Sequence, residues 1–240
     1  MRENIRALVA YIAAKKDLPE PIVEIGSFQV EGQEELANLR PFFLNKNYIG
    51  CDMREGPGVD RIENLEKLTF ENESIGTILM LDTIEHVAPL QKSMEEIQRV
   101  LKPGGWLVMT SVMDFPIHDY PEDYWRFTPK GFEYLLKNFP SQSVFFQGPP
   151  FFPHAVLGIA QKGEFEGDLP LFPKEWIEIN KNQEYKMQNY SVSSFSDALK
   201  QLERVEEELK RIKQSWSWKF TSPLRRMLDF INFIKGKIYE

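Results

Sequence analysis

Cysteine and histidine are scarce in this chain of 240 residues. The single cysteine, Cys51, excludes an internal disulfide and a thiolate metal cluster, and it fits a reducing compartment. The three histidines are far apart in sequence and lack ligand spacing, so we expect no metal site. No run of about 18 apolar residues occurs, so no membrane-spanning helix is predicted. We therefore expect a cytoplasmic protein, with peripheral contact at the inner face of the membrane as the alternative.

Basic residues are also in the minority, and the net charge is −7. The exception is the C-terminal stretch 210–240, in which eight Lys and Arg residues face two acidic ones. An acidic body repels the phosphates of DNA or RNA. We therefore expect no nucleic-acid partner.

Short apolar runs alternate with helical segments over residues 1–165. The N-terminal 1–17 has the apolar spacing of an amphipathic helix and lacks the apolar block of a signal peptide. This alternation predicts an α/β domain with a mainly parallel sheet. The predicted strands are 21–25, 48–52, 77–82, 105–111, 143–147 and 154–161, and the further predicted helices are 31–40, 91–101 and 128–136.

Three stretches of this domain carry a recognisable pattern. Val23-Glu24-Ile25-Gly26 ends the first strand, Tyr48-Ile49-Gly50-Cys51-Asp52 forms the second, and Lys102-Pro103-Gly104-Gly105 separates a helix from a strand. Together they resemble the class I S-adenosylmethionine (SAM)-dependent methyltransferases, in particular the methyltransferase type 11 group. The resemblance spans roughly residues 22–161. It implies a Rossmann-like seven-stranded sheet that ends in an antiparallel pair, with SAM as the cofactor.

The first loop, 24–32, is the expected site for the methionine part of the cofactor. Glu24, Gly26 and Ser27 fall where this family binds it, because glycine permits close approach and helix N-terminal NH groups hold a carboxylate. Phe28 and Val30 stand where the family has glycines. This departure counts against a pyrophosphate-binding NAD loop.

The adenosine part has four candidate contacts. Asp52 could accept both ribose hydroxyls, although an ordinary turn residue is the alternative, and Met53 could pack on the adenine or ribose. By resemblance, Asn64 would bond the adenine amino group and the Leu65 backbone NH a ring nitrogen. The next strand end, Leu81 and Asp82, would line the methyl-transfer chamber.

The candidate catalytic residues are Glu85, His86 and His118. A hydroxyl acceptor needs a base, and a histidine near its free pKa is suited to that role. We expect His118 to be the base, with His86 as the second candidate. Glu85-His86 resembles a pair common in the family, and a capped helix start is the alternative.

The loop 118–127 combines aromatic and charged side chains. Such loops are usual recognition elements, so Asp119, Tyr124, Trp125 and Arg126 are the candidate acceptor-binding residues. The alternative is a loop that is pinned by a buried Trp and an Arg–Asp pair.

The C-terminal third is predicted to be a linker, 166–194, followed by a helical extension, 195–240. Apolar residues recur at heptad spacing in the first part of this extension (Phe195, Ala198, Leu202, Val205, Leu209, Ile212, Trp216). This predicts a coiled-coil homodimer through 195–216 or a single amphipathic helix that folds back on the domain. The basic, aromatic 210–240 suits a membrane interface or a packed tail, and it resembles tails of surface-polysaccharide enzymes.

The leading functional hypothesis is therefore a SAM-dependent methyltransferase that is O-directed and acts on a small or glycan-linked acceptor. The alternative is a catalytically inactive SAM-fold scaffold that acts through its C-terminal helix. An NAD-dependent oxidoreductase is disfavoured, because the first loop does not make Gly-x-Gly-x-x-Gly.

Overall fold

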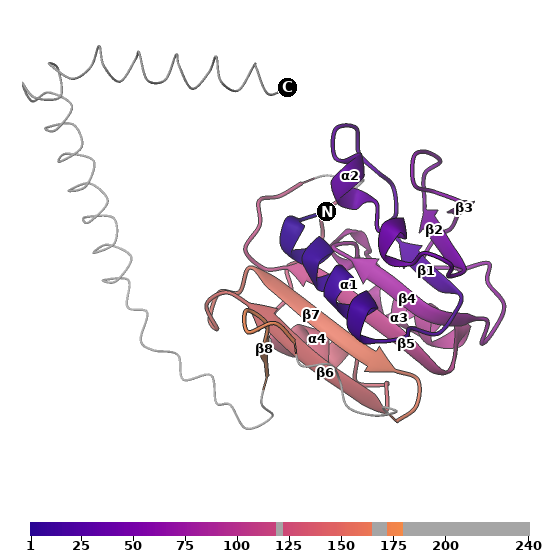
Figure 1. The fold of residues 1–240 in the computed structure, drawn as a ribbon. Helices are drawn as coiled ribbons and strands as arrows, with labels where there is room; N and C mark the ends of the chain where they lie inside the picture. The colour runs from indigo at the N-terminus through magenta and orange to yellow at the C-terminus, as the bar shows by residue number, and fades with distance from the viewer. Residues whose placement is uncertain (119–121, 165–171, 180–240) are drawn as a thin grey trace, which may run out of the picture. The chain divides into compact units, whose positions relative to one another are not determined.

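The computed structural model describes residues 1–118, 122–164 and 172–179 (Figure 1). The chain divides into two compact units, 1–185 and 186–240, and all of the described residues belong to the first. Most of the predicted linker 166–194 and the whole extension 195–240 lie outside the described residues. The coiled coil, the homodimer and the membrane contact therefore stay predictions.

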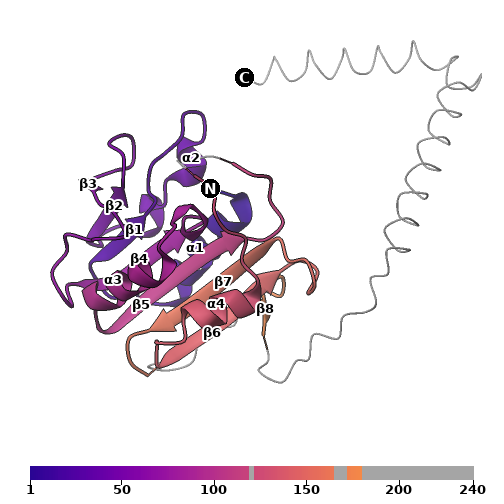
Figure 2. The ribbon, with the colours of Figure 1, turned by 180° about the vertical axis from the view of Figure 1, so that it is seen from behind.

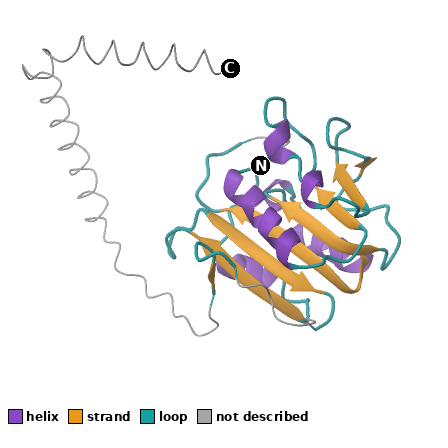
Figure 3. Cartoon of the chain, viewed as in Figure 1, coloured by secondary structure: helices purple, strands orange, loops and turns teal. Residues whose placement is uncertain are grey.

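The first unit is built on an eight-stranded sheet with the order β3-β2-β1-β4-β5-β7-β6-β8, labelled in Figure 1. Figure 3 shows its strands in orange. Strands β3, β2, β1, β4 and β5 are parallel, and β7, β6 and β8 run antiparallel to their neighbours. In chain order the elements are α1 (Glu3–Lys15), β1 (Ile22–Ile25), α2 (Glu34–Ala37), the 3-10 turn η1 (Arg40–Phe42), β2 (Tyr48–Asp52), β3 (Arg61–Ile62), β4 (Ile75–Leu81), the 3-10 turn η2 (Ile84–His86), α3 (Leu90–Val100), β5 (Leu101–Val112), α4 (Pro129–Leu135), β6 (Ser141–Gln147), β7 (Ala155–Gln161) and β8 (Ile177–Glu178).

Helices cover both faces of the sheet, with α1 on one face and α3 and α4 on the other (Figures 1 and 2). Successive residues of β4 divide between the two sides. Leu79 and Leu81 pack in the cluster that contains α1, whereas Ile78 and Met80 pack in the cluster that contains α3 and α4. This alternation follows from the two-residue period of a strand. The buried residues of α1 are those of the predicted apolar face (Ile5, Leu8, Val9, Ile12).

Two elements differ from the sequence prediction. The helix expected over 31–40 is only α2, followed by the 3-10 turn η1, because α2 has no buried residue to stabilise it. The strands β3 and β8 were not expected, since two-residue strands carry no periodic pattern.

The Lys-Pro-Gly-Gly segment is an irregularity at the start of β5 rather than a turn before it. Helix α3 ends at Val100, and the pairing with β4 jumps from Ile75↔Leu101 to Thr77↔Trp106. At the start of β4, the backbone of Gly76 lies close to that of Pro19: a Cβ added to Gly76 would lie 2.4 Å from the carbonyl oxygen of Pro19. The glycine at the start of β4 is therefore a packing requirement.

No helix within the described ranges is long and apolar enough to cross a membrane.

The core between the sheet and α3 gives a first prediction. Ile97 of α3 is fully buried, and we expect Ile97→Ala to lower the free energy of unfolding by about 2–5 kcal/mol through lost burial and a cavity. Urea denaturation measures this loss. The matched control is Ile62→Ala on β3, because Ile62 is 58% exposed and should lose about 0.5 kcal/mol or less. Equal losses at both positions would contradict this description of the core.

Candidate functional site

A cavity of about 530 Å³ lies where the parallel strands end. Parallel strands bring their carboxyl ends to one edge of the sheet, which is where α/β proteins bind ligands. The cavity is lined by every predicted cofactor residue, by the three predicted catalytic residues and by Tyr124 (Glu24, Gly26, Ser27, Asp52, Met53, Asn64, Leu65, Leu81, Asp82, Glu85, His86, His118).

The loop after β1 is held closely against the end of β4. Gly26 has φ +87°, and a Cβ at this residue would lie 2.3 Å from Oγ1 of Thr83. The NH groups of Gly26 and Ser27 both donate to the carbonyl of Cys51 (2.8 and 3.0 Å). The hydroxyl of Ser27 is buried and has no hydrogen-bond partner among the described residues. The glycine is therefore required by the packing of Thr83, and the loop keeps one unsatisfied polar group at Ser27.

The carboxylate of Glu24 is buried in β1 and accepts a hydrogen bond from the Tyr48 hydroxyl. Burial raises the pKa of Glu24 to about 7, and the hydrogen bond from Tyr48 opposes this shift only in part. Glu24 is thus close to half-protonated at neutral pH.

Asp52, at the end of β2, is partly engaged by neighbouring groups. Its Oδ1 accepts from the NH and Nε of Arg54 (3.0 and 3.3 Å), and its Oδ2 accepts from the NH of Phe28 (3.4 Å). The Arg54 guanidinium lies 4.2 Å above the centre of the Phe28 ring. Phe28, which stands in place of a family glycine, therefore supports the cation that contacts this carboxylate. Sequence reasoning missed Arg54, since nothing in the sequence pairs it with Phe28.

The segment that follows β3 carries Asn64 and Leu65 in a tight turn. Oδ1 of Asn64 accepts from the NH of Glu66 (2.8 Å), and the NH of Lys67 donates to the carbonyl of Asn64 (2.9 Å). The oxygen expected to face adenine therefore already caps its own turn. Leu65 is buried.

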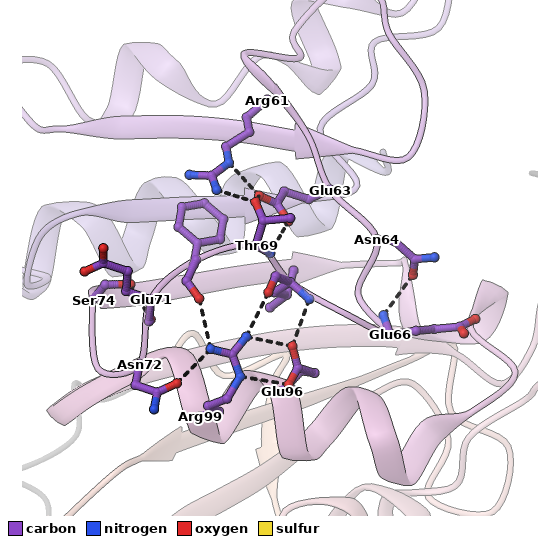
Figure 4. A network of polar contacts seen from close by, with 12 residues as sticks. Arg61, Glu63, Asn64, Glu66, Thr69, Glu71, Asn72, Ser74, Glu96 and Arg99 are labelled. Atoms are coloured by element: carbon purple, nitrogen blue, oxygen red, sulfur yellow. Dashed lines mark hydrogen bonds and ion pairs between the residues drawn. The ribbon is translucent and has the colours of Figure 1, made fainter.

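A network of polar contacts holds this segment together and joins it to α3 (Figure 4). Glu63 accepts from the NH and hydroxyl of Thr69 (2.8 and 2.6 Å) and pairs with Arg61 (2.5 Å). Arg99 of α3 donates to the carbonyls of Leu68 and Phe70 and to Glu96. The wall on the Asn64 side of the cavity is thus pre-formed.

Asp82 lies after β4 in a left-handed conformation, with φ +48°. Its carboxylate accepts two hydrogen bonds from Arg2 (2.8 and 2.9 Å) and one from Thr110 (2.9 Å). Met1 and Arg2 line the cavity, so the start of α1 is part of the site. Sequence reasoning missed Arg2, because a single basic residue before an amphipathic helix has no distinctive pattern.

Glu85 is fully buried beside this ion pair. Its Oε2 accepts from the Ser111 hydroxyl (2.8 Å), whereas Oε1 has no hydrogen-bond partner in the described part of the chain. Burial and, secondarily, the negative charge of Asp82 raise the pKa of Glu85 to about 8. The Glu85 carbonyl accepts from the NH groups of Tyr124 and Trp125 (2.9 and 3.2 Å), which joins the 122–127 segment to the end of β4.

His86 and His118 lie against each other, with ring centres 4.8 Å apart and an interplanar angle of 84°. Nδ1 of His86 lies 2.6 Å from the carbonyl oxygen of Glu122. A carbonyl only accepts, so Nδ1 carries the hydrogen and Nε2 has the free lone pair of the neutral ring. Burial lowers the pKa of His86, which favours that neutral form.

The position of His118 corrects the argument that separation in sequence rules out a metal site. One ligand atom each from Glu85, His86 and His118 lie within 4.8 Å of one another. Strand β5 runs parallel to β4, so the loop after β5, which carries His118, lies beside the end of β4. Spacing along the chain could not show this.

Trp125 and Arg126 are not among the described residues that line the cavity. The indole NH of Trp125 donates to the carbonyl of Val87 (2.9 Å). Arg126 donates to both carboxylate oxygens of Asp123 (2.5 and 2.7 Å) and to the carbonyl of Pro116 (3.0 Å). These contacts favour the alternative in which the two side chains hold the loop, and their acceptor-binding role stays a prediction. Asp119 lies outside the described residues.

The comparisons with known proteins agree with this architecture. Residues 33–109 match a family model described as a methyltransferase domain. The structure of a SAM-dependent methyltransferase from Archaeoglobus fulgidus superposes on this chain with a TM-score of 0.51 at 15% sequence identity. The superposition covers 68% of this chain and 95% of the Archaeoglobus chain. The described domain has the class I methyltransferase fold.

Two further proteins show the range of similarity to the described domain. The Burkholderia thailandensis 1,6-didemethyltoxoflavin-N1-methyltransferase, solved with S-adenosylhomocysteine, has a TM-score of 0.51 at 17% identity and covers 67% of this chain and 78% of its own. A sterol 4-C-methyltransferase of Caenorhabditis elegans is 26% identical over 136 residues, 51% of this chain and 40% of its own length.

A ubiquinone/menaquinone biosynthesis C-methyltransferase of Brucella abortus is 27% identical over 137 residues, 50% of this chain and 51% of its own. The chain thus spans about half or less of the length of these curated relatives. The family resemblance and the Rossmann-like fold expected from the sequence are confirmed, with β3 and β8 added to the six strands that the sequence pattern predicts.

The contact between Gly26 and Thr83 gives a second prediction. Gly26→Ala combines a left-handed backbone with a clash against Thr83, whereas Gly32→Ala has a similar φ of +79° and nothing within 4 Å of the added Cβ. We expect Gly26→Ala to lose about 1–3 kcal/mol more stability than Gly32→Ala, because overpacking adds to the cost of the backbone conformation. Chemical denaturation of both variants tests this, and equal losses would show that the loop is not tightly packed.

The raised pKa of Glu24 gives a pH-dependent prediction. The folded state binds the proton more tightly than the unfolded state, so the free energy of unfolding falls as pH rises from about 4.5 to about 7 and the penalty is complete above 7. Glu24→Gln can still accept from Tyr48 but cannot ionise. We expect the free energy of unfolding of Glu24→Gln, relative to that of the unmodified protein, to rise by up to about 3 kcal/mol between pH 5 and pH 8, at about 1.4 kcal/mol per pKa unit.

Urea denaturation at the two pH values measures this gain. The control is Glu35→Gln, which removes a carboxylate from an exposed position on α2. A stability difference for Glu24→Gln that is the same at pH 5 and pH 8 would contradict the raised pKa.

Proposed function

We propose that this domain catalyses SAM-dependent methylation of an oxygen atom on a small or glycan-linked acceptor. The observation that carries the proposal is the composition of one cavity. The cavity combines the loop at Gly26 and the carboxylate of Asp52 with the group of Glu85, His86 and His118. The methyltransferase-domain match to residues 33–109 supports the same conclusion.

The residues at the ends of β1 and β2 fit the cofactor. Gly26 and Ser27 line the cavity at the end of β1, and the unsatisfied Ser27 hydroxyl suits a polar group of the methionine part. Asp52 would accept the ribose hydroxyls, with Met53 beside them, and Leu65 would pack against the base. When bound, SAM supplies an electrophilic methyl group. The chain's own contribution is to align the acceptor with that group, an effect worth about 7–11 kcal/mol when the geometry is ideal.

The histidines supply the base that an oxygen acceptor requires. The Nε2 lone pair of His86 is free and the ring is held by Glu122, so it can accept the proton of an acceptor hydroxyl. His118 is the second candidate, with its Nδ1 held by Asp123 (3.1 Å) and Pro116 (3.2 Å). This order reverses the one expected from the sequence, because burial favours a neutral ring at His86. A positioned base contributes about 100- to 10,000-fold to the rate.

Transfer to oxygen rather than carbon rests on this pair of histidines. Among the relatives, a ubiquinone biosynthesis O-methyltransferase of Chelativorans is 27% identical over 96 residues, 40% of this chain and 36% of its own. The glycan-linked acceptor rests on the sequence of the C-terminal tail alone.

A catalytically inactive scaffold is the second candidate, and one contact favours it. Arg54, stacked on Phe28, already donates to Asp52 and competes with a ribose for that carboxylate. If this contact persists, the adenosine part loses its main hydrogen-bond acceptor.

Calorimetric titration with S-adenosylhomocysteine separates these two functions. We expect micromolar binding by the full chain and at least about tenfold weaker binding by Asp52→Ala, since a hydrogen bond to a charged group contributes about 1.5–3 kcal/mol. The control is Asp17→Ala, because the Asp17 side chain is 89% exposed and is not among the described residues that line the cavity. A folded protein that does not bind the ligand would support the scaffold.

A further inference from the structure

We propose that Glu85, His86 and His118 form a binding site for one divalent transition-metal ion, of the type that Zn²⁺ or Co²⁺ occupies. The three residues come from two places in the fold. Glu85 and His86 are adjacent in η2 at the end of β4, and His118 lies in the loop after β5. One ligand atom from each lies within 4.8 Å of the others, so three donors of the metal-ligand type meet at one place in the fold.

Both imidazole rings are already oriented for metal binding. Nδ1 of His86 is held by the carbonyl of Glu122 at 2.6 Å, and Nδ1 of His118 lies 3.1 Å from Oδ2 of Asp123. Metal-bound histidines usually donate their second ring NH to a carbonyl or a carboxylate in this way, which fixes the tautomer and the ring. Nε2 of each neutral ring then carries the lone pair that a metal ion needs.

The carboxylate of Glu85 supplies the independent observation. Its Oε2 is bonded to Ser111, but Oε1 is buried and has no hydrogen-bond partner within the described ranges. A buried, unpartnered carboxylate oxygen is costly. A cation held between this oxygen and the two Nε2 atoms would satisfy it.

The donor set indicates the class of ion. Two imidazole nitrogens and one carboxylate oxygen are the ligands of many catalytic zinc sites, and a fourth position stays open to water or substrate. Mg²⁺ and Ca²⁺ prefer oxygen ligands throughout and fit less well. The open position faces the cavity that all three residues line.

The role of the ion rests on the proposed function, although its binding does not. An acceptor hydroxyl at the open position would have a lower pKa and would release its proton to water. Its oxygen would then form a bond to the methyl carbon of SAM while the bond from that carbon to the sulfonium sulfur breaks, and S-adenosylhomocysteine would leave. The histidines would act as ligands rather than as the base.

The test is titration of the metal-free full chain with Co²⁺, followed by visible absorption. We expect one equivalent to produce the ligand-field bands of a site with nitrogen and oxygen ligands, and Zn²⁺ to abolish them. Glu85→Gln preserves the shape of the side chain, and His118→Asn changes a partly exposed residue. Each should weaken Co²⁺ binding by about 100-fold or more, because loss of even an outer-shell partner costs about 10–100-fold.

His154→Asn is the matched control, since it removes the remaining histidine, which pairs with Asp114 and is not among the described residues that line the cavity. It should leave the absorption bands unchanged. No bands with the unmodified protein, or bands that depend on His154 rather than on Glu85 and His118, would overturn the proposal.

The same samples titrated with S-adenosylhomocysteine separate this proposal from the proposed function. Binding of S-adenosylhomocysteine without Co²⁺ bands refutes the metal site and leaves the methyltransferase function. Co²⁺ bands without binding of S-adenosylhomocysteine support the metal site and refute that function. Because S-adenosylhomocysteine binding also reports correct folding, a variant that retains it and loses the bands assigns the ligands.

Discussion

The parallel register of β1, β2 and β4 is the constraint on which the site depends. Ile25 pairs with Cys51 on one side and with Met80 on the other. The next residue of each strand, or of the loop after it, is therefore Gly26, Asp52 and Leu81. A shift of one residue in any strand would turn its side chains to the opposite face and move its loop along the sheet. The hydrogen bonds between the strands thus set where the cavity lies, and the loops supply side chains that line it.

Loop residues then divide between those that face the cavity and those that hold other loops. Gly26 against Thr83 and Arg54 on Phe28 are contacts between loops that follow different strands. Arg126 and Trp125 do the same for the 122–127 segment, with backbone carbonyls as their partners. An aromatic and charged loop can therefore be rich in polar groups because it must be held in place, rather than because it recognises a ligand.

The parts of the fold that were predictable from the sequence are those encoded by local pattern. The face of α1 and the strand ends at Gly26 and Asp52 follow from periodicity and from turn chemistry. Strand β3, the pairing of Arg2 with Asp82 and the meeting of His86 with His118 depend on contacts between distant segments. No local rule reports those contacts, so the cofactor side of the site was easier to predict than the acceptor side.

The ion pair between Arg2 and Asp82 couples the docking of an entire helix to events in the cavity. Arg2 precedes α1, whose apolar face covers one side of the sheet, while Asp82 stands at the end of the central strand β4. A ligand that strengthens the ion pair, or replaces Arg2 or Asp82 in it, changes the free energy with which α1 is held against the sheet. By reciprocity, displacement of α1 changes the affinity for that ligand by the same factor. The amide hydrogens of α1 are consequently reporters of occupancy, since their exchange with solvent slows or quickens as the cavity fills.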